Sequence, residues 1–130
     1  MICFTIPLPP ISKKNSQQIL VNRQTGKPFI MPSKKYKQYE AAAVWYIPRG
    51  KRIDFAVNVK ALFYMETRRR VDLTNLLEAL DDALVKAGLL ADDCCTVIQS
   101  HDGSRVLYDK ENPRTEVYIT PAAGNTENTV

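Results

Sequence analysis

The chain is poor in cysteine, and the few cysteines it has are badly spaced for a covalent or metal-bound framework. Its 130 residues include three, Cys3 and the adjacent pair Cys94-Cys95. An odd number with two direct neighbours does not fit a disulfide framework. A single Cys-Cys pair cannot complete a tetrahedral zinc site either. We expect all three to be free thiols that behave as small, half-buried hydrophobic residues.

Long hydrophobic runs are also missing. No stretch of 18 or more apolar residues occurs, which excludes an ordinary transmembrane helix. The segment Met1–Ile6 has no charged residue ahead of its apolar stretch, which argues against a signal peptide. We therefore expect a cytoplasmic protein without a membrane partner. A length of 130 residues suits a single domain with one modest core.

Acidic residues are scarce in the first half of the chain. Residues 1–70 contain 14 Lys/Arg and 3 Asp/Glu, a net charge of +11, whereas residues 71–130 contain 4 and 11, a net charge of −7. Such asymmetry points to a polyanionic partner. The basic half can follow a phosphate backbone, and the acidic half can bind a metal ion. A solvated basic surface would have the same composition, so charge alone does not decide between the two.

Periodicity and turn residues divide the chain into strands and two helices. The first helix is capped by Ser33 and runs to Ile47, and the second spans residues 74–87. The order of the elements predicts one α+β domain with a mixed sheet over residues 1–120, followed by a flexible tail at 121–130. The expected strands span 2–8, 19–21, 28–31, 53–65, 96–100, 105–108 and 115–120.

One stretch runs directly from basic to acidic side chains. Arg68-Arg69-Arg70-Val71-Asp72-Leu73-Thr74-Asn75 opens the second predicted helix, and Asp92-Asp93 follows that helix. Guanidinium groups suit phosphates and clustered carboxylates bind divalent metals, so this window is typical of a nuclease. Ordinary explanations exist as well: Asp72 fits a helix N-cap, Asn75 with Glu78 fits a capping box, and Asp92-Asp93 fits a turn.

The two acidic ends of this helix meet only if the chain returns beside the preceding strand. A helix of ~14 residues spans ~21 Å, which separates Asp72 from Asp93 along the helix itself. The strand that begins near Thr96 would have to lie beside the strand that ends near Glu66. In that arrangement both carboxylates point into one cleft.

The same residues belong to a wider pattern that covers most of the chain: Arg69-Arg70-Val71-Asp72-Leu73-Thr74-Asn75-Leu76, Asp82-Ala83-Leu84, Lys86-Ala87-Gly88, Asp92-Asp93 and Val97, with Pro9-Pro10 and Asn15 before them. This pattern resembles the RusA family of Holliday-junction resolvases, which phages and prophages often encode. The resemblance implies a RusA-like α+β fold and a homodimeric endodeoxyribonuclease of recombination and repair. It also implies Mg²⁺ as cofactor, with Mn²⁺ as a substitute, no nucleotide cofactor, and paired nicking of four-way DNA junctions.

Carried onto this chain, the family pattern assigns catalysis and metal binding to Asp72 and Asp93, with Asp92 as a neighbouring metal ligand. Thr74 stands where many members have a second essential aspartate, and Glu78 where some have a functional lysine. Positions 74 and 78 share one helix face, and helical side chains lean toward the N-terminus. Either Glu78 replaces the missing carboxylate as a catalytic residue, or it belongs to the capping box.

Basic residues supply the expected DNA contacts. The three arginines would hold the backbone near the cut, because a guanidinium fork suits phosphate. The lysines would contact the backbone farther away. His101, the only histidine, is expected to be structural and stays outside the catalytic set. The expected DNA-binding residues are Arg68, Arg69, Arg70, Lys13, Lys14, Lys34, Lys35 and Asn75.

Two other functions stay open at this point. One is a branched-DNA-binding protein with weak or absent catalysis. In that case Thr74, in place of an aspartate, would indicate the lost catalysis. The other is a nuclease that cuts flaps or forks. Mg²⁺-dependent nicking of a synthetic four-way junction tests the first, and comparison of junction, flap and duplex substrates tests the second.

Overall fold

The computed structural model describes residues 1–12 and 17–122, except for the side chains at 17–18 and 30–32. Lys13 and Lys14 therefore lie outside the described residues, as does most of the expected tail, from residue 123 onward. Residues 121 and 122 continue the sheet: the last strand ends at Pro121, and the Ala122 N–H donates to the Ala56 carbonyl over 3.0 Å.

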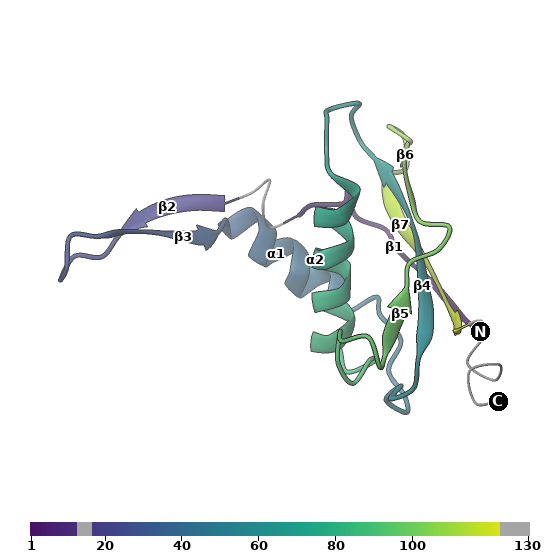
Figure 1. Cartoon of the computed structure of the whole chain (residues 1–130). Coiled ribbons are helices and arrows are strands. Elements are labelled where there is room, and N and C mark those ends of the chain that lie inside the picture. The colour runs from purple at the N-terminus through teal and green to yellow at the C-terminus, as the bar shows by residue number, and fades with distance from the viewer. Residues whose placement is uncertain (13–16, 123–130) are drawn as a thin grey trace.

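The described residues form seven strands and two helices, which confirms the predicted α+β class. The helices are α1 (Lys34–Val44) and α2 (Leu73–Lys86). Both lie on one side of the main sheet (Figure 1). The strands are β1 (Ile2–Ile6), β2 (Gln17–Val21), β3 (Pro28–Pro32), β4 (Val57–Met65), β5 (Ile98–Ser100), β6 (Arg105–Tyr108) and β7 (Arg114–Pro121).

The main sheet is mixed, as predicted, and β4 is its centre. β4 pairs with β7 in antiparallel register, and β7 pairs with β1. On its other side β4 takes two parallel neighbours in succession, β5 beside its first residues and β6 beside its last. β4 begins at Val57 rather than at the expected Ile53. Ile53 makes only an isolated bridge to Leu90, and Phe55 is 52% exposed, so the alternation before Val57 belongs to an irregular segment.

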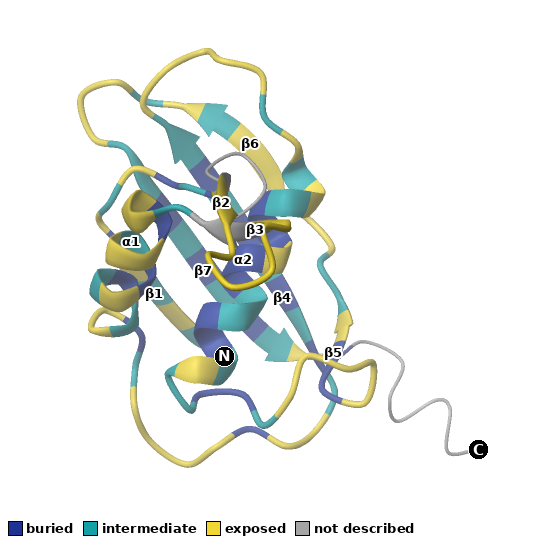
Figure 2. Ribbon diagram, turned by 90° about the vertical axis from the view of Figure 1, so that its left-hand side faces the viewer, coloured by how far each residue is buried: buried dark blue, intermediate teal, exposed yellow. Residues whose placement is uncertain are grey.

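The core lies between the sheet and α2. Along β4 every second side chain is buried, from Val57 to Phe63, which is the pattern of a strand with one face on the core. Figure 2 shows the buried residues gathered where the helices meet this face. α2 contributes an apolar seam of the kind that helical periodicity predicts: Leu76, Leu77, Ala79, Leu80, Ala83 and Leu84.

The first helix begins where the sequence predicts and ends earlier. The Ser33 hydroxyl accepts a hydrogen bond from the Tyr36 N–H over 3.1 Å, so Ser33 is the N-cap. The helix ends at Val44, and Trp45 is 78% exposed. Glu40 of α1 forms an ion pair with Lys86 of α2, which ties the two helices together.

The strands β2 and β3 form a separate two-stranded sheet that projects from the body as an arm (Figure 1). Gly26 turns the chain with a φ of 71°, a left-handed conformation that suits glycine. The Asn22 side chain accepts a hydrogen bond from the Gln24 N–H and stabilises the same turn. Apolar side chains on the arm are exposed, namely Ile19, Leu20, Val21 and Phe29.

The three cysteines are free, as predicted, but all are exposed, so their expected half-burial is wrong. Cys94 and Cys95 lie in an exposed turn between α2 and β5, where their neighbours in sequence face solvent too. Within the described residues, no helix has the length and apolarity needed to cross a membrane.

The core seam generates a stability prediction. Leu84 is completely buried, so Leu84→Ala should lower the free energy of unfolding by about 2–5 kcal/mol in urea denaturation, because it leaves a cavity. The control is Phe55→Ala in the irregular segment before β4, where the side chain is 52% exposed and the change should stay within about 0.5 kcal/mol. Equal losses in the two variants would contradict the assigned core.

Candidate functional site

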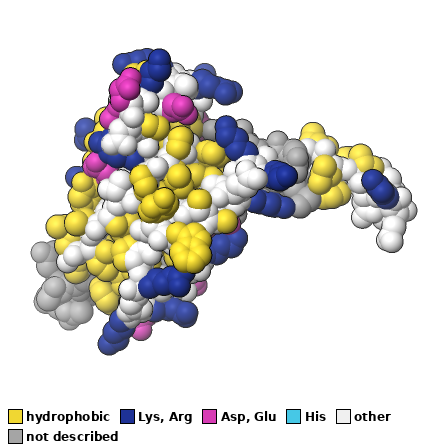
Figure 3. Space-filling model, turned by 180° about the vertical axis from the view of Figure 1, so that it is seen from behind, with side chains coloured by type: hydrophobic (Ala, Val, Ile, Leu, Met, Phe, Trp, Pro, Cys, Tyr) yellow, Lys and Arg dark blue, Asp and Glu magenta, His cyan; other side chains and the backbone are white. Residues whose placement is uncertain are grey.

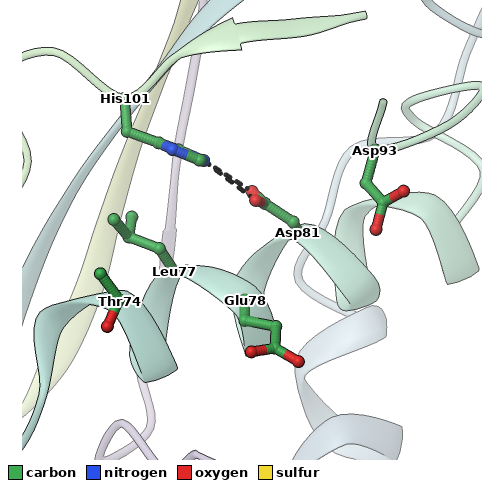
Figure 4. A pocket seen from close by; sticks show the side chains of 6 residues that line it. All are labelled: Thr74, Leu77, Glu78, Asp81, Asp93 and His101. Atoms are coloured by element: carbon green, nitrogen blue, oxygen red, sulfur yellow. Dashed lines mark hydrogen bonds and ion pairs between the residues drawn. The ribbon is translucent and has the colours of Figure 1, made fainter. Parts of the chain in front are cut away.

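A cavity of about 220 Å³ opens along the exposed side of α2. Thr74, Glu78 and Asp81 reach it from the helix at spacings of four and three residues, which places them on one face. Asp93 enters from the loop before β5, and His101 enters from the turn after β5 (Figure 4). The sixth lining residue is Leu77. Three carboxylates and one imidazole are thus collected from segments that are distant in sequence.

The parallel pairing of β4 and β5 brings these segments together. The Val57 N–H donates to the Val97 carbonyl over 2.8 Å, and Val57 lies opposite Ile98. The strand that follows Thr96 returns beside β4, as expected, and pairs with the beginning of β4. The end of β4 pairs with β6. Asp93 thus lines the cavity with Glu78 and Asp81, and Asp72 is not among the residues that line it.

Asp81 and His101 form an ion pair across the cavity (Figure 4). The His101 Nε2 lies 2.9 Å from one Asp81 carboxylate oxygen and 3.1 Å from the other. Burial raises the pKa of Asp81 above its ordinary value, and the nearby charges of Asp93 and Asp82 raise it further, while His101 acts in the opposite direction. Asp81 is therefore a largely buried carboxylate whose burial the contact with His101 partly compensates.

Asn58 on the central strand fixes the turn that carries His101. Its side-chain oxygen accepts hydrogen bonds from the Ser100 hydroxyl over 2.6 Å and from the Asp102 N–H over 2.7 Å. Its side-chain amide also donates to the Asp102 carbonyl over 3.2 Å. The residues on both sides of His101 are thus anchored to β4, and the imidazole position is set by the sheet.

Asp72 lies at the N-terminal end of α2, outside the residues that line the cavity. It occupies the N-cap position without a capping hydrogen bond from its side chain. Instead, the Asn75 side-chain amide donates to its carboxylate over 3.3 Å. Because the helix starts at Leu73, the capping box of Asn75 and Glu78 is wrong, and Glu78 faces the cavity.

Asp92 is exposed and points its carboxylate at its own loop. It accepts a hydrogen bond from the Asp93 N–H over 2.7 Å, and this bond lowers the pKa of Asp92 below its ordinary value. The turn interpretation therefore accounts for the contacts of Asp92. The side chain of Asp93, in contrast, lines the cavity.

The predicted DNA-contacting arginines are exposed beyond the end of β4. Arg68 and Arg69 line a second, larger hollow with Tyr108 of β6, of about 400 Å³. The Arg68 guanidinium carbon lies 4.1 Å from the centre of the Tyr108 ring, a cation–π contact. Lys34 and Lys35 are exposed at the start of α1, next to the arm. Seen from behind, basic side chains lie at both ends of the body and on the arm (Figure 3).

The donor chemistry of the cavity fits a hard divalent cation. Glu78 and Asp93 present carboxylate oxygens to the same space, and oxygen is the ligand type that Mg²⁺ prefers. Both oxygens of Asp81 face His101, so we do not count Asp81 as a ligand. No group of three or more His, Cys, Asp or Glu among the described residues could hold a metal ion. Mg²⁺ commonly needs only one or two carboxylates and completes its shell with water and phosphate oxygens.

Comparison with known proteins identifies the family of the chain. The family described as Endodeoxyribonuclease RusA matches residues 7–120. The chain belongs to the RusA family of endodeoxyribonucleases. It is also 30% identical over 105 residues to the crossover junction endodeoxyribonuclease RusA of Aquifex aeolicus (strain VF5), and the match covers 78% of this chain and 79% of that protein. The resemblance inferred from the sequence is confirmed, and the family match spans both helices and every residue that lines the cavity.

Two cavity residues of this RusA-family chain were missed by sequence reasoning. Asp81 was not considered, and His101 was set aside as structural. One signal was available for Asp81: it continues the polar face of α2 that runs through Thr74 and Glu78 at helical spacing. The contact of His101 with that face depends on the register of β5 against β4, for which the sequence carries no local signal.

Proposed function

We propose that this RusA-family nuclease resolves four-way DNA junctions by metal-assisted hydrolysis of the phosphodiester backbone, and that it acts in the cytoplasm. The observation that carries this proposal is the convergence of Glu78 and Asp93 on one cavity, within the region that matches the family. The relative from Aquifex aeolicus is named for activity on crossover junctions. Branched DNA is accordingly the proposed substrate, and nicks in a pair of opposed strands are the proposed product.

Mg²⁺ is the proposed ion, with Mn²⁺ able to replace it. Asp93 and Glu78 would hold it in the cavity, while Asp92 fixes the loop of Asp93. Asp72 would act from outside the cavity, at the N-cap of α2, as a further catalytic carboxylate that binds metal apart from this pair. When bound, such an ion supplies a nucleophilic water at neutral pH and stabilises charge on the phosphate. Glu78 takes the place of the carboxylate missing at Thr74, since a neutral hydroxyl is a poor substitute beside this ion.

The protein's own basic groups would position the DNA. Arg68, Arg69 and Arg70 project beyond β4 next to the N-terminus of α2, where their guanidinium forks suit the phosphates that flank the cut. Asn75 would support the same backbone from the first turn of α2. The more distant lysines would steer the duplex arms without reading sequence: Lys13, Lys14, Lys34 and Lys35.

The arm supports a homodimer. Ile19 and Val21 lie on one face of the ribbon and are 72% and 61% exposed, while Leu20 and its partner Phe29 are exposed on the other face. A two-stranded sheet is marginally stable alone, and exposed apolar patches mark interaction sites. Residues 17–32 contain no Asp or Glu. We propose that a second copy of the chain covers the arm, because two-fold symmetry presents two equal cavities to a four-way junction.

The catalytic assignment predicts separate losses of cutting and binding. Asp93→Asn, Asp72→Asn and Glu78→Gln should each reduce Mg²⁺-dependent cleavage of a synthetic four-way junction by at least ~10²-fold, because each removes a proposed ligand charge. Binding in a gel-shift assay should stay near the wild-type level. The control Asp54→Asn neutralises an exposed carboxylate away from the cavity and should leave cleavage unchanged.

Other outcomes decide between the competing functions. Full cleavage by Asp93→Asn would contradict the site. Full cleavage by Glu78→Gln would mean that Glu78 does not replace the carboxylate missing at Thr74. Wild-type binding without cleavage would identify a junction-binding protein. Equal or faster cleavage of flaps or forks would identify a less selective nuclease.

The dimer assignment predicts a change in mass. Ile19→Ser with Val21→Ser should convert a dimer into a monomer in light scattering without changing the thermal unfolding of the body, because the arm contributes little to the core. The variant should make single nicks in a junction rather than paired ones. Arg23→Ser, at the polar tip of the same arm, is the control and should remain dimeric. A monomeric wild-type protein would contradict the assignment.

A further inference from the structure

We propose that His101, held by Asp81, is the general acid of the cleavage reaction and protonates the sugar oxygen that leaves when the phosphodiester is cut. This inference rests on the proposed nuclease function. It adds a proton donor to a site whose other ionisable side chains are carboxylates.

The placement of His101 supports this role. Of the described residues that line the cavity, His101 is the one that can carry a positive charge. Its side chain is 28% exposed, compared with 13% for Asp81, so the imidazole stands between the buried carboxylate and the open space. The Nε2 atom is occupied by Asp81. The second ring nitrogen, Nδ1, is therefore the atom available to a substrate.

The imidazole is held from two directions. Asp81 on α2 fixes Nε2, and Asn58 on β4 holds the backbone and side chain of the two residues that flank His101. A second clamp follows three residues later, where the Ser104 hydroxyl accepts the Ala61 N–H over 2.9 Å. An acid placed by a sheet and a helix needs little reordering when substrate binds, which is a requirement for efficient proton transfer.

The surroundings of Asp81 are consistent with a functional role. Burial raises the pKa of Asp81, and Asp93 and Asp82 raise it further, although the contact with His101 acts in the opposite direction. The folded protein thus holds this charge at a cost. Carboxylates that are kept charged in unfavourable surroundings concentrate at functional sites.

The proposed step balances in atoms and charge. A water oxygen forms a bond to phosphorus, and one of its protons passes to solvent. The bond between phosphorus and the bridging sugar oxygen breaks. The imidazolium of His101 gives its Nδ1 proton to that oxygen, which leaves as an alcohol, and the neutral imidazole takes up a proton from solvent before the next cycle. Asp81 positions the ring throughout and balances its positive charge while the ring is protonated.

A substrate that needs no acid tests this role. A sulfur in place of the bridging oxygen at the cut leaves as a thiolate, which is far less basic than an alkoxide. His101→Ala should lower kcat on the ordinary junction by ~10²-fold or more, with little change in KM. Two junctions are compared, one with sulfur at the 3′ bridging position of the cut and one with sulfur at the 5′ bridging position. On the junction whose sulfur is the leaving atom, the kcat of His101→Ala should be within a few-fold of the wild-type kcat. Equal losses on all substrates would overturn the proposal.

Asp81→Asn provides a readout other than activity. It should raise the midpoint of thermal unfolding, because it removes a buried charge, and should lower kcat selectively on the oxygen substrate. Asp102→Asn, an exposed carboxylate in the same turn, is the matched control and should change neither. A lower unfolding midpoint with cleavage unchanged would mean that the pair is structural. If the wild-type protein cuts none of these junctions, the nuclease proposal is wrong. If the wild-type protein cuts them but sulfur does not restore the activity of His101→Ala, only the role of His101 as general acid is wrong.

Discussion

The packing of α2 against β4 is the constraint on which the rest of the structure depends. Two parallel strands need a crossover connection, and α2 provides the one between β4 and β5. Its leucine seam must face the sheet to be buried, so the opposite side carries Thr74, Glu78 and Asp81. The register of β5 then brings Asp93 and His101, which flank that strand, to the same side of the helix.

This arrangement concentrates negative charge in the cavity on α2, where the charge does not stabilise the fold. Asp81, Glu78 and Asp93 share one cavity, and the pKa of Asp81 is raised by burial and by its acidic neighbours. Repulsion of this kind disfavours the empty site and favours a bound cation. The basic cluster at the far end of β4 supplies the opposite charge for a polyanion. The separation of the two charges along the sequence thus becomes a separation in space.

The elements could be predicted from the sequence because their signals are local. Alternation marked β4, leucine spacing marked α2, and Ser33 marked the start of α1. The membership in the RusA family was predictable from the pattern around Asp72 and Asp93. The N-cap position was one of the roles open to Asp72 in the sequence. The pairing of β5 with the beginning of β4 and the contact of His101 with Asp81 could not be predicted, because both depend on strand register.

The proposed mechanism requires that the cavity on α2 binds the divalent ion. Titration of the ¹⁵N-labelled protein with Mn²⁺ tests it directly, because a bound paramagnetic ion broadens the NMR signals of the nearest backbone amides. We expect broadening centred on Glu78, Asp81 and Asp93, and we expect that it disappears in Asp93→Asn. Broadening centred on the acidic residues near Arg114, which are Asp109 and Glu116, with the cavity unaffected, would contradict it.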